Sequence, residues 1–205
     1  MDDLILIGAG GHARSCIDVI EQNKMFRIVG LIDKNVSPGE RIDGYSVIGN
    51  DETLQTVRAT CTSAIVTIGQ IKNSDDRVRL YQYLQDLEFI LPTIVAPSAY
   101  VSRNSIIGSG TIIMHNAQVS AGSTIGSNCI VNSFALIEHD ATVGDHCHVS
   151  TGTILNGQAA VGERCFIGSG AIVMQNVTIG DDCVIGSGVM VHRDVPPNSV
   201  LRHES

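Results

Sequence analysis

Residues 119–144 read VSAGSTIGSNCIVNSFALIEHDATVG, and an aliphatic residue returns at every sixth position of this stretch. The same period continues without a miss from Val95 to Val191. A small or slender residue stands four positions after almost every aliphatic one, as Ala135 does after Val131. Because two inward residues four apart share strand parity, each hexad is predicted to be a short strand followed by a corner.

A column of glycines sets the number of strands per turn. Glycine recurs every 18 residues, at Gly108, Gly126, Gly144, Gly162 and Gly180. The interval indicates three hexads per turn, with one corner that needs the conformational freedom of glycine. We therefore expect a triangular prism of parallel strands, a solenoid. The pattern resembles that of hexapeptide-repeat proteins, and this resemblance implies a left-handed parallel β-helix.

Four of the six cysteines follow the same spacing, at Cys129, Cys147, Cys165 and Cys183. They should stack in one interior column, about 4.8 Å apart from rung to rung. Cysteine here occupies the position that Ala, Ser and Thr fill in other hexads, so we interpret it as a small buried hydrophobe and not as a metal ligand. Unpaired thiols fit a reducing compartment.

Composition argues against several classes of function. The 205 residues are 43% apolar and 17% charged, with a net charge of -8, which suits one or two globular domains. The chain has no basic stripe, no Trp, four Tyr and four Phe, so nucleic acid is not an expected partner. We find no apolar run of transmembrane length and no secretory signal pattern, and expect a cytoplasmic protein without a membrane partner.

The first ninety residues show a different pattern. LILIGAGGHARSCIDVIEQ (4–22) reads as a strand, a glycine-rich turn and a helix, and RIVGLIDKN (27–35) and SAIVTIG (63–69) read as two further strands. These are the signals of a parallel sheet that binds ligands at the carboxyl ends of its strands. The sequence thus predicts an α/β Rossmann-like domain over residues 1–90 and a β-helix domain over residues 91–205.

The glycine-rich turn is a candidate phosphate site, because backbone amides at a helix N-terminus attract anions. Such a turn is a weak signal by itself, but acidic and basic residues at the end of the next strand favour a nucleotide diphosphate. We expect the substrate site of this domain to comprise Gly8, Gly10, Gly11, His12, Asp33, Lys34 and Gly69.

The stretch IEHDATVGDHCH (137–148) contains His139, His146 and His148. Their separations are far from 18, so they cannot stack into a zinc site within one prism, although an intersubunit zinc site stays open. His139 lies at a corner, where Asp140 could orient it as a general base. Gly157, 18 residues later, would place a backbone N–H beside the imidazole as an oxyanion donor.

The alternative for His139 is a solvated surface histidine. His148 precedes an inward residue, so it is predicted to point out of a flat face that a trimer partner could cover. His146 is interpreted as a surface residue without a role.

Four motifs together carry a more specific resemblance: GAGGHA (8–13), IDK (32–34), TIGQIKNSDDR (67–77) and VNSFALIEHD (131–140). Over essentially its whole length the chain resembles the sialic acid O-acetyltransferase and nucleotide-sugar N-acetyltransferase family of bacterial surface-glycan pathways. The resemblance implies an acetyl-CoA-dependent acyltransferase in which His139 is the base and Asp140 tunes it. Asn132 and His148 match further active-site positions, and Gly157 matches the donor to the thioester carbonyl.

The resemblance also implies a homotrimer in which acetyl-CoA lies between neighbouring prisms, against Gly168, Ser169, Gly186 and Ser187. We expect the protein to be active without a metal. The family often ends in a glycine-x-proline-alanine-lysine tail, whereas this chain ends in VPPNSVLRHES (195–205). N-acetylation of a nucleotide-linked amino sugar is the favoured function. The alternatives are O-acetylation of a sialic acid or related sugar, and a non-enzymatic, nucleotide-sensing trimeric scaffold.

Overall fold

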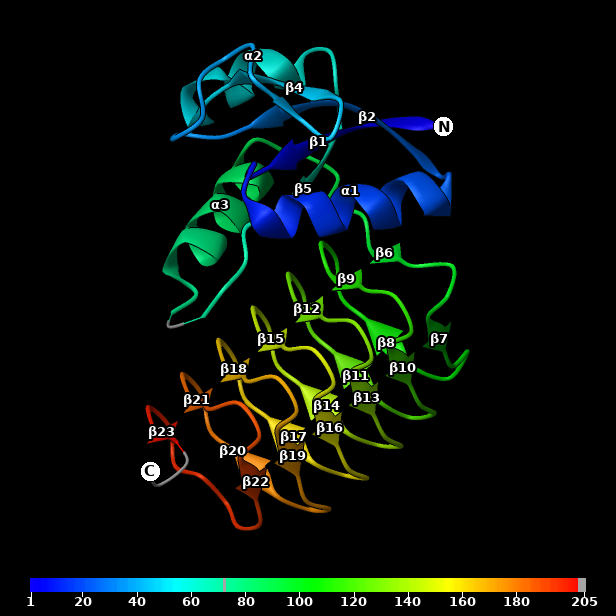
Figure 1. Cartoon of the computed structure of the whole chain (residues 1–205), viewed down its shortest axis with the longest axis vertical. Helices are drawn as coiled ribbons and strands as arrows, with labels where there is room; N and C mark the ends of the chain where they lie inside the picture. Colours follow the sequence, from blue (N-terminus) through cyan, green and yellow to red (C-terminus); the bar gives the residue numbers. More distant parts are fainter. Residues whose placement is uncertain (72, 203–205) are drawn as a thin grey trace.

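A computed structural model of the chain describes residues 1–71 and 73–202 (Figure 1). An α/β domain formed by the N-terminal residues lies along one face of a prism of short parallel strands. The predicted order of an α/β domain and a parallel β-helix is confirmed. The last three residues of the predicted 91–205 unit lie outside the described residues.

The N-terminal domain is built on a five-stranded sheet of order β3-β4-β2-β1-β5, parallel except for the β3–β4 pair. Strand β1 lies between β2 and β5, so the chain changes direction across the sheet there, and α/β sheets bind ligands at such a point. The elements are β1 (Asp2–Ile7), α1 (Gly11–Asn23), β2 (Phe26–Ile32), β3 (Arg41–Ile42), β4 (Tyr45–Gly49), the 3-10 helix η1 (Asp51–Thr53), α2 (Leu54–Arg58), β5 (Ser63–Val66) and α3 (Asp75–Asp86).

Three sheets form the faces of the prism, with paired strands 18 residues apart. The domain-facing sheet contains β6 (Ile94–Val95), β9 (Ile112–Ile113), β12 (Ile130–Val131), β15 (His148–Val149), β18 (Phe166–Ile167), β21 (Val184–Ile185) and β23 (Val200–Leu201). The aliphatic sheet contains β7 (Tyr100–Val101), β10 (Gln118–Val119), β13 (Leu136–Ile137), β16 (Ile154–Leu155), β19 (Ile172–Val173) and β22 (Met190–Val191). The threonine sheet contains β8 (Ile106–Ile107), β11 (Thr124–Ile125), β14 (Thr142–Val143), β17 (Ala160–Val161) and β20 (Thr178–Ile179).

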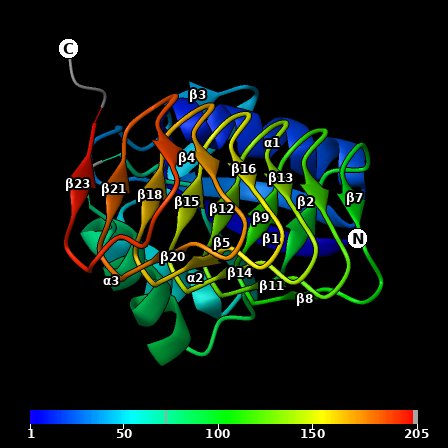
Figure 2. The same cartoon turned by 90° about the horizontal axis from the view of Figure 1, so that it is seen from below.

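The interior of the prism is one continuous apolar core, formed by the aliphatic and small residues of the six-residue period. The four stacked cysteines are fully buried in it, as predicted. Each thiol donates to a carbonyl of the next turn, as Cys147 Sγ does to Gly162 O at 2.9 Å. Figure 2, seen from below, shows the rungs of the prism side by side with the N-terminal domain behind them.

The glycine column exists for a different reason from the predicted one. Its members do not have positive φ angles; instead, a Cβ on Gly108 would lie 2.5 Å from the backbone of Gly126. Glycine is therefore required by the close approach of successive rungs. The left-handed conformation occurs instead at one residue of every corner, recurring every six residues, as at Asn116, Asn128 and Asp140, and Asn and Asp tolerate it better than most residues.

The two parts of the chain share a packed interface. Ile94, Ile112 and Ile130, on the outer side of the domain-facing sheet, join Leu4 and Ile17 of the N-terminal domain in one buried cluster. Helix α1 covers these strands, and α3 with the loop after β5 lies over the following ones (Figure 1). This packing places the carboxyl ends of β1, β2 and β5 next to the prism.

Candidate functional site

A cavity of about 570 Å³ lies between the carboxyl ends of these strands and the prism. Asn132 and His148 of the prism line it. So do all the residues predicted for the substrate site: Gly8, Gly10, Gly11, His12, Asp33, Lys34 and Gly69. The fold thus brings the nucleotide-site candidates beside two of the candidate catalytic residues.

The glycine-rich turn leaves room for a ligand. A Cβ on Gly10 or Gly11 would meet no atom within 4 Å, whereas Gly8 has a φ of +119° and its Cβ would lie 2.7 Å from Ile68. The first turn of α1, which is described in full, carries no acidic residue. The positive end of the helix dipole is therefore not offset by an acidic residue of the helix itself, which suits a phosphate.

Asp33 and Lys34 contribute to the cavity wall in different ways. Asp33 accepts hydrogen bonds from the backbone N–H groups of Ala9 and Asn35, at 2.8 and 2.7 Å. It therefore ties the end of β2 to the glycine-rich turn. Lys34 Nζ lies 3.3 Å from Asp76 in an exposed pair, and because such pairs are weak, the lysine is available to an anionic ligand.

Two histidines line the inner part of the cavity, the buried His148 and the half-buried His12, with ring centroids 6.2 Å apart. His148 Nδ1 donates to the carbonyl of Gln70 at 2.8 Å, and its Nε2 lies 3.3 Å from Asn132 Nδ2. Burial lowers the pKa of His148 to about 4 and the pKa of His12 to about 3. Both rings are neutral at pH 7, so they offer hydrogen bonds and no charge.

Two predictions about histidines need correction. His148 does point out of a flat face, but the loop after β5 of its own chain covers it, through Gln70. His146 is not a surface residue without contacts. Its Nδ1 lies 3.0 Å from Asn128 Nδ2, and its ring meets the edge of Tyr81 with centroids 5.4 Å apart. His146 therefore belongs to the contact between α3 and the prism.

Arg77 is the residue of this contact that the sequence did not reveal. Its side chain is buried and donates to Ile68 O at 2.7 Å, to Asn128 Oδ1 at 3.1 Å and to Asn128 O. It thereby anchors the loop that carries Gly69 and Gln70 to the prism. The only sequence signal was its place at the end of TIGQIKNSDDR (67–77).

His139 and Asp140 lie at another corner, between the aliphatic and threonine sheets. The His139 side chain is 57% exposed, and its Nδ1 is 3.0 Å from Asp140 Oδ2. A Cβ on Gly157 would lie 2.6 Å from His139 Nε2, so the imidazole rests directly against this glycine. Within the described parts of the chain the Gly157 N–H donates no hydrogen bond. An imidazole nitrogen thus stands beside an unused donor.

The remaining candidates divide between two corner columns. The His139 edge, between the aliphatic and threonine sheets, carries residues at intervals of 18: His139, Gly157, Gln175 and Arg193. The Asn132 edge, between the domain-facing and aliphatic sheets, carries Asn132, Ser150, Gly168, Ser169, Gly186 and Ser187. A full strand of the aliphatic sheet separates the two edges. One chain alone therefore does not bring His139 to the cavity.

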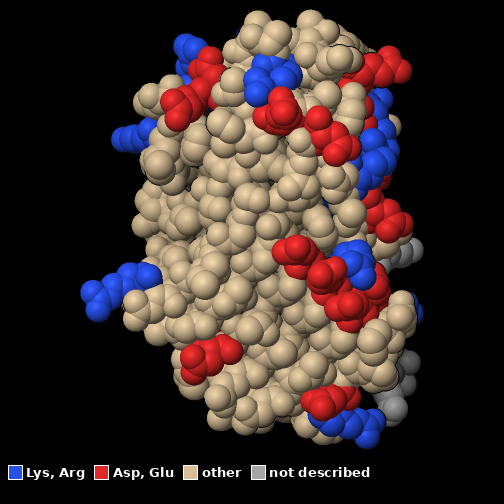
Figure 3. Space-filling view, turned by 180° about the vertical axis from the view of Figure 1, so that it is seen from behind, with Lys and Arg blue, Asp and Glu red and all other residues tan. Residues whose placement is uncertain are grey.

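The aliphatic sheet between these edges presents an uncharged outer surface. Its outward positions include Leu136, Ile154, Ile172 and Met190, the last of them 56% exposed. The threonine sheet is also uncharged at its outward strand positions, but more polar. Figure 3 shows a broad area without Lys, Arg, Asp or Glu across the middle of the molecule.

A serine, a histidine and an aspartate also meet where α1 touches the prism. His115 Nδ1 lies 3.1 Å from Ser98 Oγ, and its Nε2 lies 2.9 Å from Asp18 Oδ2. In a hydrolytic triad Nε2 faces the serine and Nδ1 the aspartate, so the order here is reversed. We interpret this group as a contact between the two parts of the chain.

Residues 1–71 and 73–202 contain neither a metal-binding cluster nor a membrane-spanning helix. No group of three or more His, Cys, Asp or Glu side chains is arranged to hold a metal ion. Nor does any helix in these ranges have the length and apolar character needed to cross a membrane.

Family models match both parts of the chain. The PglD N-terminal domain model matches residues 3–84, and the bacterial transferase hexapeptide model of six repeats matches residues 104–139, 122–157 and 159–193. A comparison with curated proteins finds no match.

Solved structures match the whole chain. The chain is 31% identical to a His-to-Asn mutant of perosamine N-acetyltransferase from Caulobacter crescentus in complex with CoA and GDP-perosamine, with a TM-score of 0.92 over 98% of this chain and 93% of that one. It is 30% identical to the acetyltransferase domain of PglB from Neisseria gonorrhoeae, with a TM-score of 0.90 over 98% and 96%. The chain is 31% identical to the same domain in complex with acetyl coenzyme A, with a TM-score of 0.89 over 97% of this chain and 94% of that one.

Proposed function

The chain belongs to the nucleotide-sugar acetyltransferase family of PglD-type N-terminal domains and hexapeptide repeats, and on this basis we propose that it transfers the acetyl group of acetyl-CoA to the amine of a nucleotide-linked amino sugar. That it is an acyltransferase follows from the family. The observation that carries the proposal is the cavity, in which the glycine-rich turn faces Asn132 and His148.

In the proposed complex the diphosphate lies on the glycine-rich turn. The amides at the start of α1 and the ammonium group of Lys34 neutralise its charge. The sugar then extends toward Asn132 and His148, whose polar atoms are within hydrogen-bonding distance of each other. A neutral His148 can bind a sugar hydroxyl or amine without adding a positive charge beside it.

The chemistry proposed at the His139 edge is a direct transfer. The amine nitrogen attacks the thioester carbonyl carbon while His139 Nε2 accepts its proton. The carbonyl oxygen becomes an oxyanion, which the N–H of Gly157 stabilises. The C–S bond then breaks, and the coenzyme A thiolate leaves as the amide forms. Asp140 holds the imidazole through Nδ1, which leaves Nε2 as the reacting nitrogen.

This chemistry requires a second copy of the chain, because the His139 edge and the cavity lie apart in one copy. We propose a homotrimer in which the His139 edge of one subunit faces the Asn132 edge and cavity of the next. Acetyl-CoA would lie in the groove between them, against Gly168, Ser169, Gly186 and Ser187. The uncharged aliphatic sheet supports this arrangement, since it offers an apolar surface to a neighbour.

The proposal is tested with acetyl-CoA, a thiol reagent and a panel of nucleotide amino sugars and sialic acids. Coenzyme A should be released only with a nucleotide-linked amino sugar, and mass spectrometry should find one added acetyl group on its nitrogen. Acetylation of a sialic acid hydroxyl instead would establish the O-acetyltransferase alternative. Release with none of the acceptors would favour the nucleotide-sensing scaffold.

A substitution in the glycine-rich turn tests whether this turn binds the nucleotide sugar and not acetyl-CoA. Gly10→Val fits sterically at a position where a Cβ meets no atom, and it fills the space where a phosphate would approach the backbone. It should raise KM for the nucleotide sugar at least tenfold and leave KM for acetyl-CoA unchanged. An equal rise in KM for both substrates would contradict the assignment of this cavity to the nucleotide sugar.

A further inference from the structure

Phe134 has a backbone conformation that is unusual for its side chain. Its φ angle is 60°, and none of the other seven Phe and Tyr residues, all of which the structure describes, has a positive φ. A bulky residue in this left-handed region costs free energy, because its Cβ crowds the backbone. Residues held in such conformations gather at functional sites, so Phe134 is a candidate for a role in binding.

The same corner in neighbouring turns of the prism is occupied by residues that tolerate a positive φ. Their φ angles lie between 56° and 71°, and they are Asn116, Gly152, Gly170 and Gly188. The corner of Phe134 is a four-residue turn, closed by the hydrogen bond from Ala135 N–H to Asn132 O at 3.1 Å. A positive φ at the third residue of a turn favours Gly or Asn. The repeat therefore does not require an aromatic residue at position 134.

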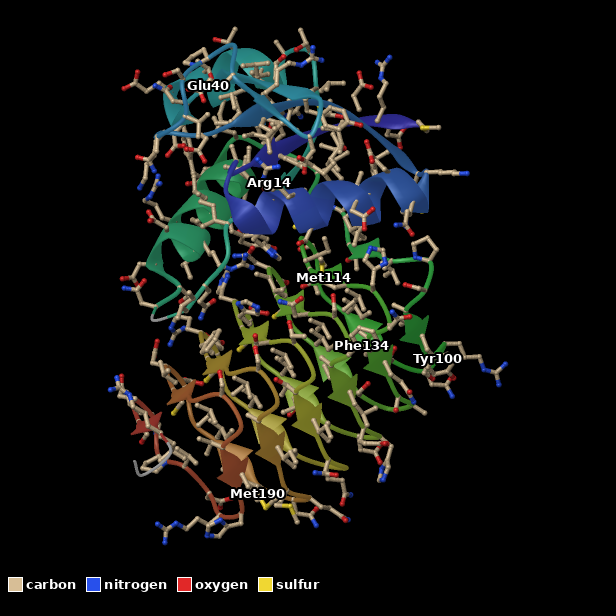
Figure 4. The ribbon with its side chains drawn as sticks, viewed as in Figure 1. Arg14, Glu40, Tyr100, Met114, Phe134 and Met190 are labelled. Atoms are coloured by element: carbon tan, nitrogen blue, oxygen red, sulfur yellow. The ribbon has the colours of Figure 1, made fainter. Side chains whose placement is uncertain are left out.

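The core of the prism does not require this ring either. Phe134 is 63% exposed and is absent from the buried core of the prism. Among the Phe and Tyr residues, only Tyr100, at 59%, is also exposed, and Figure 4 labels both on the prism. Since neither the turn nor the core accounts for the ring of Phe134, we look for its contact outside the chain.

The turn that carries Phe134 begins at the wall of the cavity proposed for the sugar. Asn132 lines this cavity. Its Oδ1 accepts the backbone N–H of Ser133 at 2.8 Å, and its Nδ2 lies 3.3 Å from His148 Nε2. The residue proposed to bind the sugar thus also fixes the turn that presents the ring. Both belong to one chain, so a sugar beside Asn132 reaches Phe134 without crossing a subunit boundary.

Phe134 also lies near the level of the proposed base along the prism. His139 follows it by five residues on the same turn, beyond β13. One turn of 18 residues rises about 4.8 Å, so the two residues differ in height by about 2 Å. In a closed trimer whose axis runs along the prism, equal turns of the subunits lie at equal heights. The His139 edge of a neighbouring subunit would then face Phe134 across the acceptor.

We propose that Phe134 binds the acceptor, with its ring packed against the C–H face of the amino-sugar ring. The C–H groups on one face of a pyranose form an apolar surface that suits an aromatic ring, while Asn132 and His148 bind polar groups at the margin of the sugar. Held from two sides, the sugar directs its amine toward the His139 edge of the neighbour. This inference rests on the proposed function, in which the sugar extends from the cavity toward Asn132.

Phe134→Asn removes the ring and introduces the residue found at this corner one turn earlier. The melting temperature should stay equal or rise, because asparagine tolerates the left-handed backbone. KM for the nucleotide sugar should rise roughly tenfold, while KM for acetyl-CoA stays unchanged. Phe134→Tyr keeps the ring and should keep both wild-type values. Tyr100→Asn is the matched control, because it removes a similarly exposed ring two turns away and should change neither KM.

Calorimetry gives a readout that does not depend on turnover. The ligands are each nucleotide amino sugar of the acceptor panel and the nucleoside diphosphate that it contains. Phe134→Asn should bind the nucleotide sugar roughly tenfold more weakly than the wild-type protein does. It should bind the nucleoside diphosphate with wild-type affinity, because only the sugar reaches the ring.

Several outcomes would overturn the proposal: equal weakening of both ligands, no weakening of either, or a wild-type protein that binds no ligand of the panel. A lower melting temperature with dissociation of the trimer would also overturn it, since Phe134 would then be a subunit contact. A wild-type protein that binds the nucleotide sugar but transfers no acetyl group would refute the proposed function. The difference between the two ligands would still decide the role of Phe134.

Discussion

The two halves of the proposed site both contain histidine, in opposite surroundings. His139 is 57% exposed and rests against Gly157 at an open corner. His148 and His12 are enclosed between the two parts of the chain, and burial lowers the pKa of each ring far enough to keep it neutral. The comparison shows why the two kinds of histidine receive different roles in the proposed mechanism: the enclosed rings as fixed hydrogen-bonding groups, and the exposed His139 as the proton acceptor.

We expect the largest effect on kcat from removing the exposed imidazole of His139. His139→Ala should lower kcat by roughly 10²- to 10⁴-fold, because it removes the proton acceptor of the attacking amine. The melting temperature and the affinity for acetyl-CoA should stay close to wild type, since the side chain is outside the core. Steady-state kinetics with saturating acceptor check this, and a variant that keeps more than about a tenth of wild-type kcat would exclude His139 as the base.

The neighbouring glycine should show the next largest effect. Gly157→Ala places a methyl group 2.6 Å from His139 Nε2, so the ring must move away from the reacting position. We expect kcat to fall by roughly 10- to 100-fold, with less effect on stability because the displaced atoms are at the free end of a side chain. Unchanged kcat in this variant would show that the contact between the two residues has no part in the reaction.

Asp140→Asn should have a smaller effect than either change. Asparagine tolerates the left-handed backbone of this position, where φ is 58°, so the fold should be preserved. The variant keeps a hydrogen-bonding group beside His139 but loses the negative charge that stabilises the protonated ring. We expect kcat to fall by roughly tenfold. A loss as large as that of His139→Ala would assign the base function to the pair as a unit.

The pH dependence of stability should reveal the lowered pKa of the buried His148. Since the pKa of His148 falls from 6.5 to about 4 on folding, the unfolded chain binds its proton more readily, and stability decreases as the pH falls from 6.5 toward 4. At pH 5 this amounts to about 2 kcal/mol for one such residue. His148→Asn can still donate to Gln70 O but does not titrate.

Melting curves at pH 7 and pH 5 check this expectation. The wild-type protein should lose more stability between these pH values than His148→Asn does. An identical loss in His148→Asn and wild type would show that His148 is not held neutral by the fold.

The sequence alone predicted those parts of the structure that follow from a single repeat period. The six-residue period predicted the prism, and the 18-residue spacing predicted that His139 and Gly157 are stacked neighbours. The sequence did not predict the contacts between the N-terminal domain and the prism. Neither Arg77 nor the contact of His146 with Tyr81 could be predicted, because a strand period does not specify which face of the prism another domain covers.

The glycine column illustrates a subtler limit. The sequence correctly required glycine at one position in every turn, but it could not distinguish a positive φ from a close approach of backbones. Gly126, whose Cβ would lie 2.7 Å from the backbone nitrogen of Asp145, belongs to the second kind. Such contacts depend on the distance between rungs, which a single sequence does not contain.

The central claim is that the reacting histidine and the sugar cavity come from different subunits, and mixed trimers test it most directly. His139→Ala and Gly10→Val chains, each inactive at low nucleotide-sugar concentration, are co-expressed with different tags, and mixed trimers are purified beside the two parent trimers. If each site spans two chains, one site in every mixed trimer combines an intact His139 edge with an intact cavity, and activity returns to about a third of wild type. If mixed trimers form but stay as inactive as their parents, the two halves act within one chain and the account is wrong.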